Sequence, residues 1–264
     1  MTAGNLVSGF LATLKILQGA LEVKAAGVAG VAALNAGEVH FKTAIWCILA
    51  ACIFDLLDGR LARLGGTDSP FGREFDSLAD VVSFGVAPAL LVSRVLLREY
   101  ERIGWIVASI YLVCGAMRLA RFNCIAASNI KSASSDFKGI PIPAAAGLIA
   151  SVTLFIMSLT NDQVEHWVMK WILPPLLLFL SWMMFSSFTY PSFKNINWRT
   201  TRSMPKLLAI VVVIMLTATF YHWMPAVIFI TYLLYGFLRP FLSRKMKESI
   251  EETPEDEDPE PDSP

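Results

Sequence analysis

Apolar residues gather in eight long segments along this 264-residue chain, separated by shorter stretches that are richer in polar residues. Several segments approach the ~20 residues that a helix needs to cross the hydrocarbon core of a bilayer. The pattern predicts eight membrane helices near residues 5–21, 41–58, 73–97, 103–120, 142–160, 171–188, 206–221 and 223–238. Residues 22–40 are rich in Ala and Gly, and they either extend the first helix or form an external connection.

Composition supports this interpretation. Hydrophobic residues make up 55% of the chain and charged residues 17%, and the mean hydropathy is +0.55. These values are typical of an integral membrane protein, so we predict an all-α membrane fold in contact with membrane lipids and expect no nucleic-acid partner.

The zero net charge conceals an uneven distribution. Nine of the 22 acidic residues lie between Glu248 and Asp262, which leaves 22 basic and 13 acidic residues in 1–247. The Pro-rich acidic tail, 248–264, has no apolar periodicity and is expected to be disordered. With an internal N-terminus, fifteen Lys and Arg fall on one side of the membrane and six on the other, so the positive-inside rule predicts cytoplasmic termini in a cell membrane.

Four aspartates interrupt the apolar pattern. Asp55 and Asp58 are three residues apart, and Asp76 and Asp80 are four apart, so each pair shares one face of a helix. The residues between the pairs include Gly65-Gly66 and Ser69-Pro70, which favour a turn and therefore a helical hairpin. Four converging carboxylates near lipid would repel one another, so the pattern predicts one or two hard divalent cations at the cytoplasmic face.

Two classes of protein would place acids in this way. Small residues on the hairpin, among them Gly59, Ala62 and Gly72, permit close helix packing, and they would also give a nucleotide pyrophosphate room beside Arg63. A cation transporter or channel is the alternative, because acidic residues in membrane helices often mark an ion pathway. Such a pathway does not require small residues and an arginine at these offsets.

The run Asp55-x2-Asp58-Gly59-x2-Ala62-Arg63-x8-Gly72-x3-Asp76-x3-Asp80 resembles the motif of the CDP-alcohol phosphotransferase family at all eight specified positions. The resemblance implies a six-helix membrane core, here 1–188, with two additional membrane helices in 189–247. It also implies two divalent cations, Mg²⁺ or Mn²⁺ with Ca²⁺ as a third candidate, on the four aspartates. A CDP-linked donor would lie against Gly59, Ala62, Arg63, Gly72 and Ser77, and the family suggests a homodimer.

Further runs are similar to the phosphatidylserine synthases of that family. They are Gly4-Asn5-Leu6-Val7-Ser8-Gly9-Phe10, the stretch from Ser77 to Pro88, Arg118-Leu119-Ala120-Arg121-Phe122-Asn123, and the stretch from Phe137 to Gly147. This likeness implies CDP-diacylglycerol as the donor and L-serine as the acceptor, with Asp80 taking the proton of the serine hydroxyl and Asn5 contacting substrate. Glycerol phosphate, inositol phosphate and choline stay open as alternative acceptors.

Serine brings a carboxylate to a site that already holds carboxylates, so a cationic partner is needed. Arg118 and Arg121, three residues apart at a predicted helix end, are candidates together with Lys131. The sequence leaves open whether each binds serine or the lipid phosphate, and ordinary positive-inside flanking would also explain them.

Overall fold

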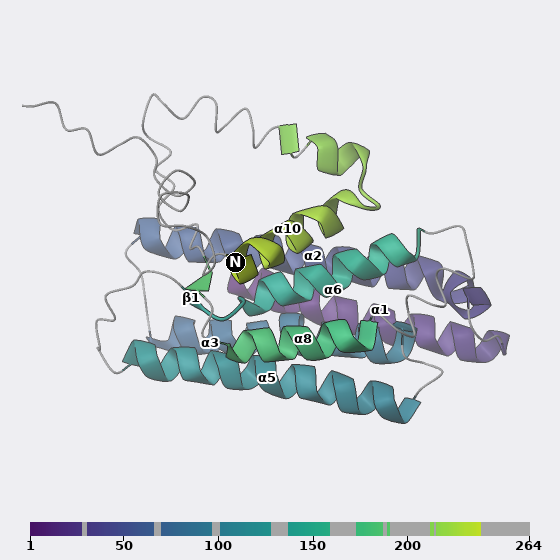
Figure 1. The fold of residues 1–264 in the computed structure, drawn as a ribbon, viewed down its shortest axis with the longest axis horizontal. Coiled ribbons are helices and arrows are strands. Elements are labelled where there is room, and N and C mark those ends of the chain that lie inside the picture. The colour runs from purple at the N-terminus through teal and green to yellow at the C-terminus, as the bar shows by residue number, and fades with distance from the viewer. Residues whose placement is uncertain are drawn as a thin grey trace, which may run out of the picture.

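The computed structural model describes residues 1–27, 31–65, 70–96, 101–127, 137–158, 173–186, 189–190, 212–213 and 215–238. Nearly all of these residues are helical (Figure 1). Four helices are long and apolar enough to cross a membrane: Thr2–Ala26, Ala36–Gly59, Phe71–Val95 and Arg102–Ile125. Shorter apolar helices accompany them, so the predicted all-helical, multi-pass membrane architecture is confirmed.

The first two helices are α1 (Thr2–Ala26) and α2 (Val31–Gly65), which pack along each other. Their contact depends on glycine, because a Cβ on Gly19 or Gly37 would lie within 2.6 Å of the Phe41 ring. Together the two helices take up most of 22–40, the region whose structure the sequence left open. Gly27, with φ of +65°, ends α1 in the left-handed conformation that favours glycine.

The third membrane helix is continuous from Pro70 to Leu96 but changes its winding. It consists of α3 (Pro70–Asp80), the π-helical turn η1 (Val81–Val86), α4 (Ala87–Leu91) and a second π-helical turn, η2 (Val92–Leu96). Pro88 has no N–H, so the carbonyl of Phe84 lacks its α-helical donor. The Tyr111 hydroxyl donates to that carbonyl at 2.9 Å, which satisfies it inside the core.

The remaining helices cover this arrangement. They are α5 (Glu101–Ala127), α6 (Ile142–Ile156), α8 (Leu173–Phe185) and α10 (Met224–Leu238). α5 packs on α8 and η1, while α6 lies between α2 and α10. The predicted segment 206–221 falls partly outside the described residues, and its described residues include helical turns at 212–213 and 215–219.

One feature is not helical. β1 (Phe137–Lys138) pairs antiparallel with β2 (Thr189–Tyr190), with Phe137 opposite Tyr190. Two residues on each side are too few for a period-2 pattern, so this ladder could not be predicted from the sequence. Gly139, with φ of +78°, follows it and lies so close to α8 that a Cβ would be 2.5 Å from the Met184 carbonyl oxygen.

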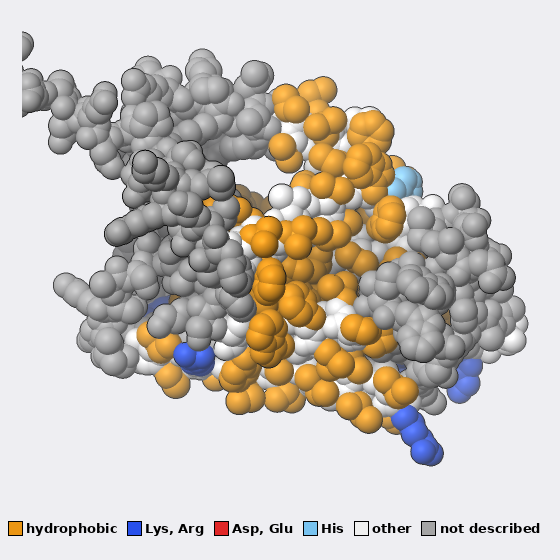
Figure 2. Space-filling view, in the orientation of Figure 1, with side chains coloured by type: hydrophobic (Ala, Val, Ile, Leu, Met, Phe, Trp, Pro, Cys, Tyr) orange, Lys and Arg blue, Asp and Glu red, His pale blue; other side chains and the backbone are white. Residues whose placement is uncertain are grey.

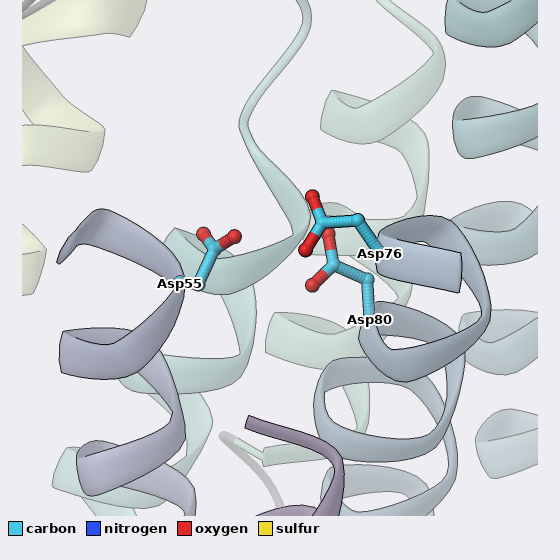
Figure 3. A group of neighbouring side chains, drawn as sticks. All are labelled: Asp55, Asp76 and Asp80. Carbon is cyan, nitrogen blue, oxygen red and sulfur yellow. The ribbon is translucent and has the colours of Figure 1, made fainter. Parts of the chain in front are cut away.

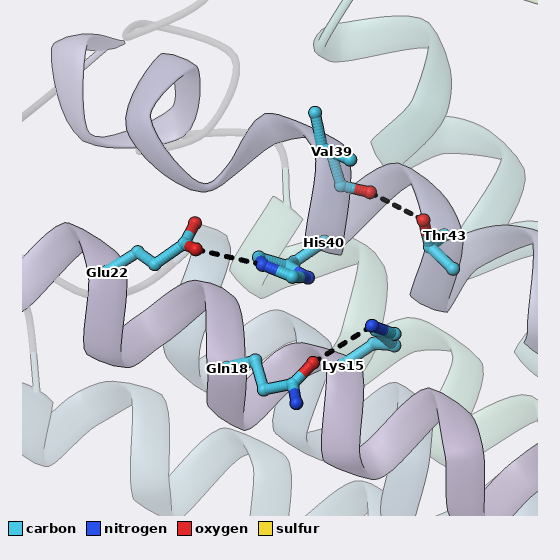
Figure 4. A network of polar contacts seen from close by, with 6 residues as sticks. All are labelled: Lys15, Gln18, Glu22, Val39, His40 and Thr43. Atoms are coloured by element: carbon cyan, nitrogen blue, oxygen red, sulfur yellow. Dashed lines mark hydrogen bonds and ion pairs between the residues drawn. The ribbon is translucent and has the colours of Figure 1, made fainter.

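The surface fits a lipid environment. Figure 2 shows hydrophobic side chains across the middle of one face, with Lys and Arg at its margins. Polar groups inside the first two helices have local partners (Figure 4): Glu22 pairs with His40 at 2.9 Å, and Lys15 Nζ donates to Gln18 at 3.0 Å. Such pairing lowers the cost of holding charged side chains in membrane helices.

Candidate active site

Three of the four aspartates converge where α2 and α3 meet. Asp55, Asp76 and Asp80 each offer a carboxylate oxygen, and these oxygens lie within 4.8 Å of one another. Figure 3 shows Asp55 projecting from α2 toward Asp76 and Asp80, which stand one turn apart on α3. Asp80 is 7% exposed, and the other two are half-buried.

The two helices have ends that fit the predicted hairpin. α2 continues to Gly65, and α3 begins at Pro70, where proline is favoured because the first helical N–H has no partner to lose. The spacing of three and four residues therefore directs both acidic pairs toward the same region, as the sequence predicted.

Asp58 is not one of the three acids within 4.8 Å of one another, but it lies close enough to interact electrostatically with Asp55 and Asp76. It is half-buried one turn after Asp55, and the Thr2 hydroxyl donates a hydrogen bond to its carboxylate. Thr2 is 56 residues away in sequence, so no local pattern could have revealed this contact. The structure thus brings three predicted ligands within reach of one ion and holds the fourth beside the N-terminus of α1.

Asn5 supports Asp80 from α1. Its side-chain amide donates to Asp80 at 2.9 Å, and the Ser83 hydroxyl donates to the Asn5 carbonyl at 2.9 Å. α1 approaches this closely because residue 9 is glycine: a Cβ there would lie 2.5 Å from the Ser83 Cα. The sequence suggested Asn5 as a substrate contact, and the structure adds a hydrogen bond that orients an acid.

The donor set suits a hard divalent cation. Carboxylate oxygens are the ligands that Mg²⁺, Mn²⁺ and Ca²⁺ prefer, and three like charges this close repel one another unless a cation offsets them. Asp76 Oδ1 is buried, and within the described part of the chain it has no hydrogen-bond partner. A bound ion would satisfy that oxygen, so the cluster could hold a metal.

The two candidate arginines have different surroundings. Arg118 is half-buried on α5, interacts electrostatically with Asp80, and has a buried Nε with no hydrogen-bond partner among the described residues. Arg121 is exposed one turn later. Lys131 lies outside the described residues, so the structure does not place it.

The expected nucleotide contacts are placed in part. Gly59 is exposed and Gly72 half-buried near the two ends of the hairpin. Ala62 and Arg63 belong to the α2 backbone, but their side chains lie outside what the structure describes. Ser77 donates to the Arg73 carbonyl at 3.1 Å and accepts from Asn123 at 2.9 Å, a contact that ties α3 to α5.

This geometry can be compared with known proteins. A family model described as CDP-alcohol phosphatidyltransferase matches residues 14–184, about two thirds of the chain. The chain belongs to the CDP-alcohol phosphatidyltransferase family. The match contains all four aspartates and Arg118, and α10 lies beyond it. Family membership favours the enzyme over the transporter or channel that the isolated acids would also have allowed.

Curated relatives carry a more specific name. A protein of Helicobacter pylori named CDP-diacylglycerol–serine O-phosphatidyltransferase is 38% identical over 209 residues, covering 77% of this chain and 82% of the relative. Relatives with the same name in Methanocaldococcus jannaschii and Saccharomyces cerevisiae are each 40% identical, over 149 and 118 residues. The match to the Methanocaldococcus jannaschii protein covers 56% of this chain and 63% of the relative. The match to the Saccharomyces cerevisiae protein covers 43% of this chain and 42% of the relative.

Proposed function

We propose that this chain transfers the phosphatidyl group of CDP-diacylglycerol to the hydroxyl of L-serine, forming phosphatidylserine and CMP. The observation that carries the proposal is the carboxylate cluster with Arg118 beside Asp80, in a chain whose relatives bear the name of this activity. An acidic cluster alone suits an anionic donor only when cations are bound, and the arginine adds a second place for an anion.

Asp55, Asp58, Asp76 and Asp80 would hold two divalent cations, Mg²⁺ or Mn²⁺. When bound, such ions neutralise pyrophosphate charge and stabilise the departing CMP. The orphaned oxygen of Asp76 and the three converging carboxylates support this ligand set. Asp58 would join it from the neighbouring turn, where the Thr2 hydroxyl fixes its carboxylate.

The reaction itself is a single in-line displacement. The serine oxygen attacks the phosphorus that carries diacylglycerol, and the bond from that phosphorus to the bridging oxygen breaks, so CMP leaves with the bridging oxygen. Asp80 accepts the proton of the serine hydroxyl as the new bond forms. The hydrogen bond from Asn5 at 2.9 Å holds the Asp80 carboxylate in one orientation for that transfer.

Substrate binding follows from the same surroundings. Arg118 would bind either the serine carboxylate or the lipid phosphate, because its guanidinium can form paired hydrogen bonds with an anion. Arg121 and Lys131 are the other candidates for this role. Asn5 Oδ1 is buried and without a hydrogen-bond partner in the described ranges, which supports a substrate contact for this side chain.

The CDP moiety would lie along the hairpin, with Gly59, Ala62, Gly72 and Ser77 giving clearance and Arg63 facing the pyrophosphate. The site would open at the cytoplasmic face of the cell membrane, in agreement with the charge distribution. We also propose 1–188 as the catalytic core, 189–247 as an additional helical unit, and a homodimer. The acidic tail, 248–264, lies outside the described residues.

The test is CMP release from labelled CDP-diacylglycerol by the purified chain in detergent, with serine, glycerol phosphate, inositol phosphate and choline offered in turn. Serine should support release and yield labelled phosphatidylserine. Exhaustive chelation with EDTA should abolish release, and added Mg²⁺ or Mn²⁺ should restore it. Release with another acceptor alone would overturn serine as the acceptor, and full activity after chelation would overturn the metal site.

A further inference from the structure

Two hydrogen bonds join helix α5 to the third membrane helix. The Asn123 side-chain amide donates to the Ser77 hydroxyl oxygen on α3 at 2.9 Å, and the Tyr111 hydroxyl donates to the Phe84 carbonyl in η1, also at 2.9 Å. The partners are 46 and 27 positions apart in sequence, so both bonds are tertiary contacts. Side-chain hydrogen bonds across helices are one of the forces that associate helices in a membrane.

The two bonds lie on either side of Asp80 and Arg118. On α5, Arg118 lies between the two donors, five residues before Asn123, and on the third helix Asp80 lies between the two acceptors, three residues after Ser77. The earlier donor binds the later acceptor, so the two helices run antiparallel. At 1.5 Å per residue, Arg118 lies about 7.5 Å from Asn123 along one axis, and Asp80 lies about 4.5 Å from Ser77 along the other. The two bonds therefore hold Arg118 and Asp80 at a similar depth on neighbouring helices.

The Ser77 hydroxyl has no proton left for a substrate. A hydroxyl carries one proton and two lone pairs. The proton of Ser77 goes to the Arg73 carbonyl at 3.1 Å, and the Asn123 amide occupies one lone pair at 2.9 Å. Phosphate oxygens accept hydrogen bonds, so Ser77 has nothing to donate to a pyrophosphate while both bonds are in place. Beside the CDP moiety Ser77 would give clearance only, and its hydroxyl serves as the link to α5.

We propose that Asn123 is a positioning residue, whose hydrogen bond to Ser77 sets the distance between the acidic face of α3 and Arg118 of α5. Asp76 directly precedes Ser77 and Asp80 follows within one turn, so the bond lies beside both acids of α3. None of the three clustered acids lies on α5. The bond thus connects the carboxylates of α2 and α3 with the cation of α5. This inference rests on the proposed function, because it assumes that Arg118 binds a substrate anion.

The place of the bond predicts which kinetic constants depend on it. α5 ends at Ala127, only four residues after Asn123, so loss of the amide releases the last turns of the helix from α3. The bond from the buried Tyr111 still holds the middle of α5. Arg118 lies between these points and would shift relative to a bound anion, whereas the carboxylates of α2 and α3 would keep their mutual spacing. The substrate constant that depends on Arg118 should change, and the metal requirement should not.

The experiment is a double-mutant cycle on the full-length chain in detergent. Asn123→Ala, Ser77→Ala and their combination are compared by the KM for serine, the KM for CDP-diacylglycerol, kcat and the Mg²⁺ concentration that gives half-maximal CMP release. Ser93→Ala is the matched control, because Ser93 lies on the same continuous helix as Ser77 and its hydroxyl donates within that helix, to the Leu90 carbonyl at 3.1 Å. Thermal unfolding of each variant reports whether the fold is retained.

Asn123→Ala should raise, by about three- to tenfold, the same Michaelis constant that Arg118→Lys raises, while the half-maximal Mg²⁺ concentration changes by less than about twofold. Ser77→Ala should have the same effect. The double variant should be no worse than the more impaired single variant, because the two residues form one contact and coupled effects do not add. Ser93→Ala should leave every constant within about twofold of the wild type.

Several results would overturn the inference. They are unchanged Michaelis constants in Asn123→Ala, losses that add fully in the double variant, and a lower unfolding temperature as the only effect. A loss in Ser77→Ala beside a silent Asn123→Ala would assign Ser77 to direct contact with the donor and would overturn it as well. If Asn123→Ala does not fold, Asn123→Ser, whose side chain is polar but one bond shorter, takes its place under the same expectations.

Failure of the proposed function has a different signature. Spin labels on Cys124 and on Glu74→Cys, both exposed positions, report the separation of α5 and α3 without any substrate, once the other three cysteines are replaced by alanine. The distance distribution should shift or broaden in Asn123→Ala and stay unchanged in Ser93→Ala, and an unchanged distribution in Asn123→Ala would overturn the inference. If the wild type releases CMP only with another acceptor, serine is wrong as the substrate, and the same cycle run with that acceptor still measures the coupling.

Discussion

Neighbouring residues of the same type have different environments here. Arg118 and Arg121 are three positions apart on α5, and both were candidates for anion binding from the sequence. The structure places Arg118 half-buried beside Asp80 and leaves Arg121 exposed. A charge removed from water interacts more strongly with an anion than a charge at the surface. At the scale of the residue, the two arginines should therefore contribute unequally to substrate binding.

We predict that Arg118→Lys raises the Michaelis constant of one substrate by roughly ten- to a hundredfold, because a point charge replaces a planar fork and a charge-assisted hydrogen bond worth ~1.5–3 kcal/mol is lost. Steady-state CMP release, with serine and CDP-diacylglycerol varied separately, measures both constants. A rise for serine alone would assign Arg118 to the serine carboxylate, and a rise for the donor alone would assign it to the lipid phosphate.

The matched control is Arg121→Lys, which should change either constant by less than about threefold, since an exposed cation is screened by solvent and salt. If Arg121→Lys impairs the enzyme more than Arg118→Lys, the burial of Arg118 is the wrong guide to the anion pocket, and Lys131 becomes the next residue to test.

The carboxylate cluster gives a second prediction. Asp55→Asn, Asp76→Asn and Asp80→Asn should each lower CMP release by about 100-fold or more while the protein remains folded, because each removes a ligand charge from a site built on helices. Glu38→Gln is the control: it makes the same acid-to-amide change where Glu38 pairs with Lys42, outside the cluster. Activity near wild type in any cluster variant would exclude that aspartate as an essential ligand.

At the scale of the element, one helix crossing sets the position of the acid that we assign as the base. α1 approaches η1 where Gly9 meets Ser83, and Asn5, one turn earlier on the same face, then reaches Asp80. The hydrogen bond from Ser83 to the Asn5 carbonyl fastens the same crossing. Small residues at such crossings let membrane helices approach closely, and here that approach also orients a carboxylate.

Gly9→Ala should therefore impair both stability and activity. The new Cβ would lie 2.1 Å from the Ser83 hydroxyl oxygen and 2.5 Å from its Cα, and relieving an overlap with backbone costs about 1–3 kcal/mol. We expect a lower unfolding temperature in detergent and a reduced kcat, since Asn5 moves away from Asp80.

Gly4→Ala is the control on the same helix, because its Cβ would meet the Phe54 ring at an ordinary 3.5 Å. Thermal unfolding and CMP release should stay close to wild type in this variant. Equal stability and activity of Gly9→Ala and Gly4→Ala would show that the crossing tolerates a wider separation than the argument allows.

At the scale of the whole molecule, the arrangement of the helices ties the site to one end of the bundle. The N-terminus lies there because Thr2 bonds to Asp58, and the end of α5 lies there because Asn123 bonds to Ser77. Glu22, 17 residues after Asn5, lies about 25 Å farther along α1, toward the opposite end of the bundle. If the active site is cytoplasmic, every residue at the end of the bundle that holds the site should also face the cytoplasm.

Cys124 is a native cysteine through which this orientation can be tested by chemical labelling. It is exposed and lies at the end of the candidate span Arg102–Ile125, while Cys47, Cys52 and Cys114 are half-buried within their spans. A membrane-impermeant maleimide should label Cys124 in inverted membrane vesicles and not in intact cells, and Cys124→Ser should abolish the signal. Labelling in intact cells alone would place the site on the outer face and contradict the orientation inferred from the positive-inside rule.

The sequence by itself determined the features that depend on local pattern. Apolar length predicted membrane helices, and the spacing of Asp55, Asp58, Asp76 and Asp80 predicted a helical hairpin with acids facing one another, because helix periodicity converts spacing into direction. The family motif could also be recognised from the sequence, because its residues all fall within a run of 26 positions.

Only the tertiary structure decided which distant side chains meet. The hydrogen bonds from Asn5 to Asp80, from Thr2 to Asp58 and from Asn123 to Ser77 join residues far apart in the chain. Such contacts depend on how helices cross and rotate, and the crossings follow from packing around positions such as Gly9 and Gly19. A helical period tells which residues share a face, whereas the partner of that face is fixed only when the bundle assembles.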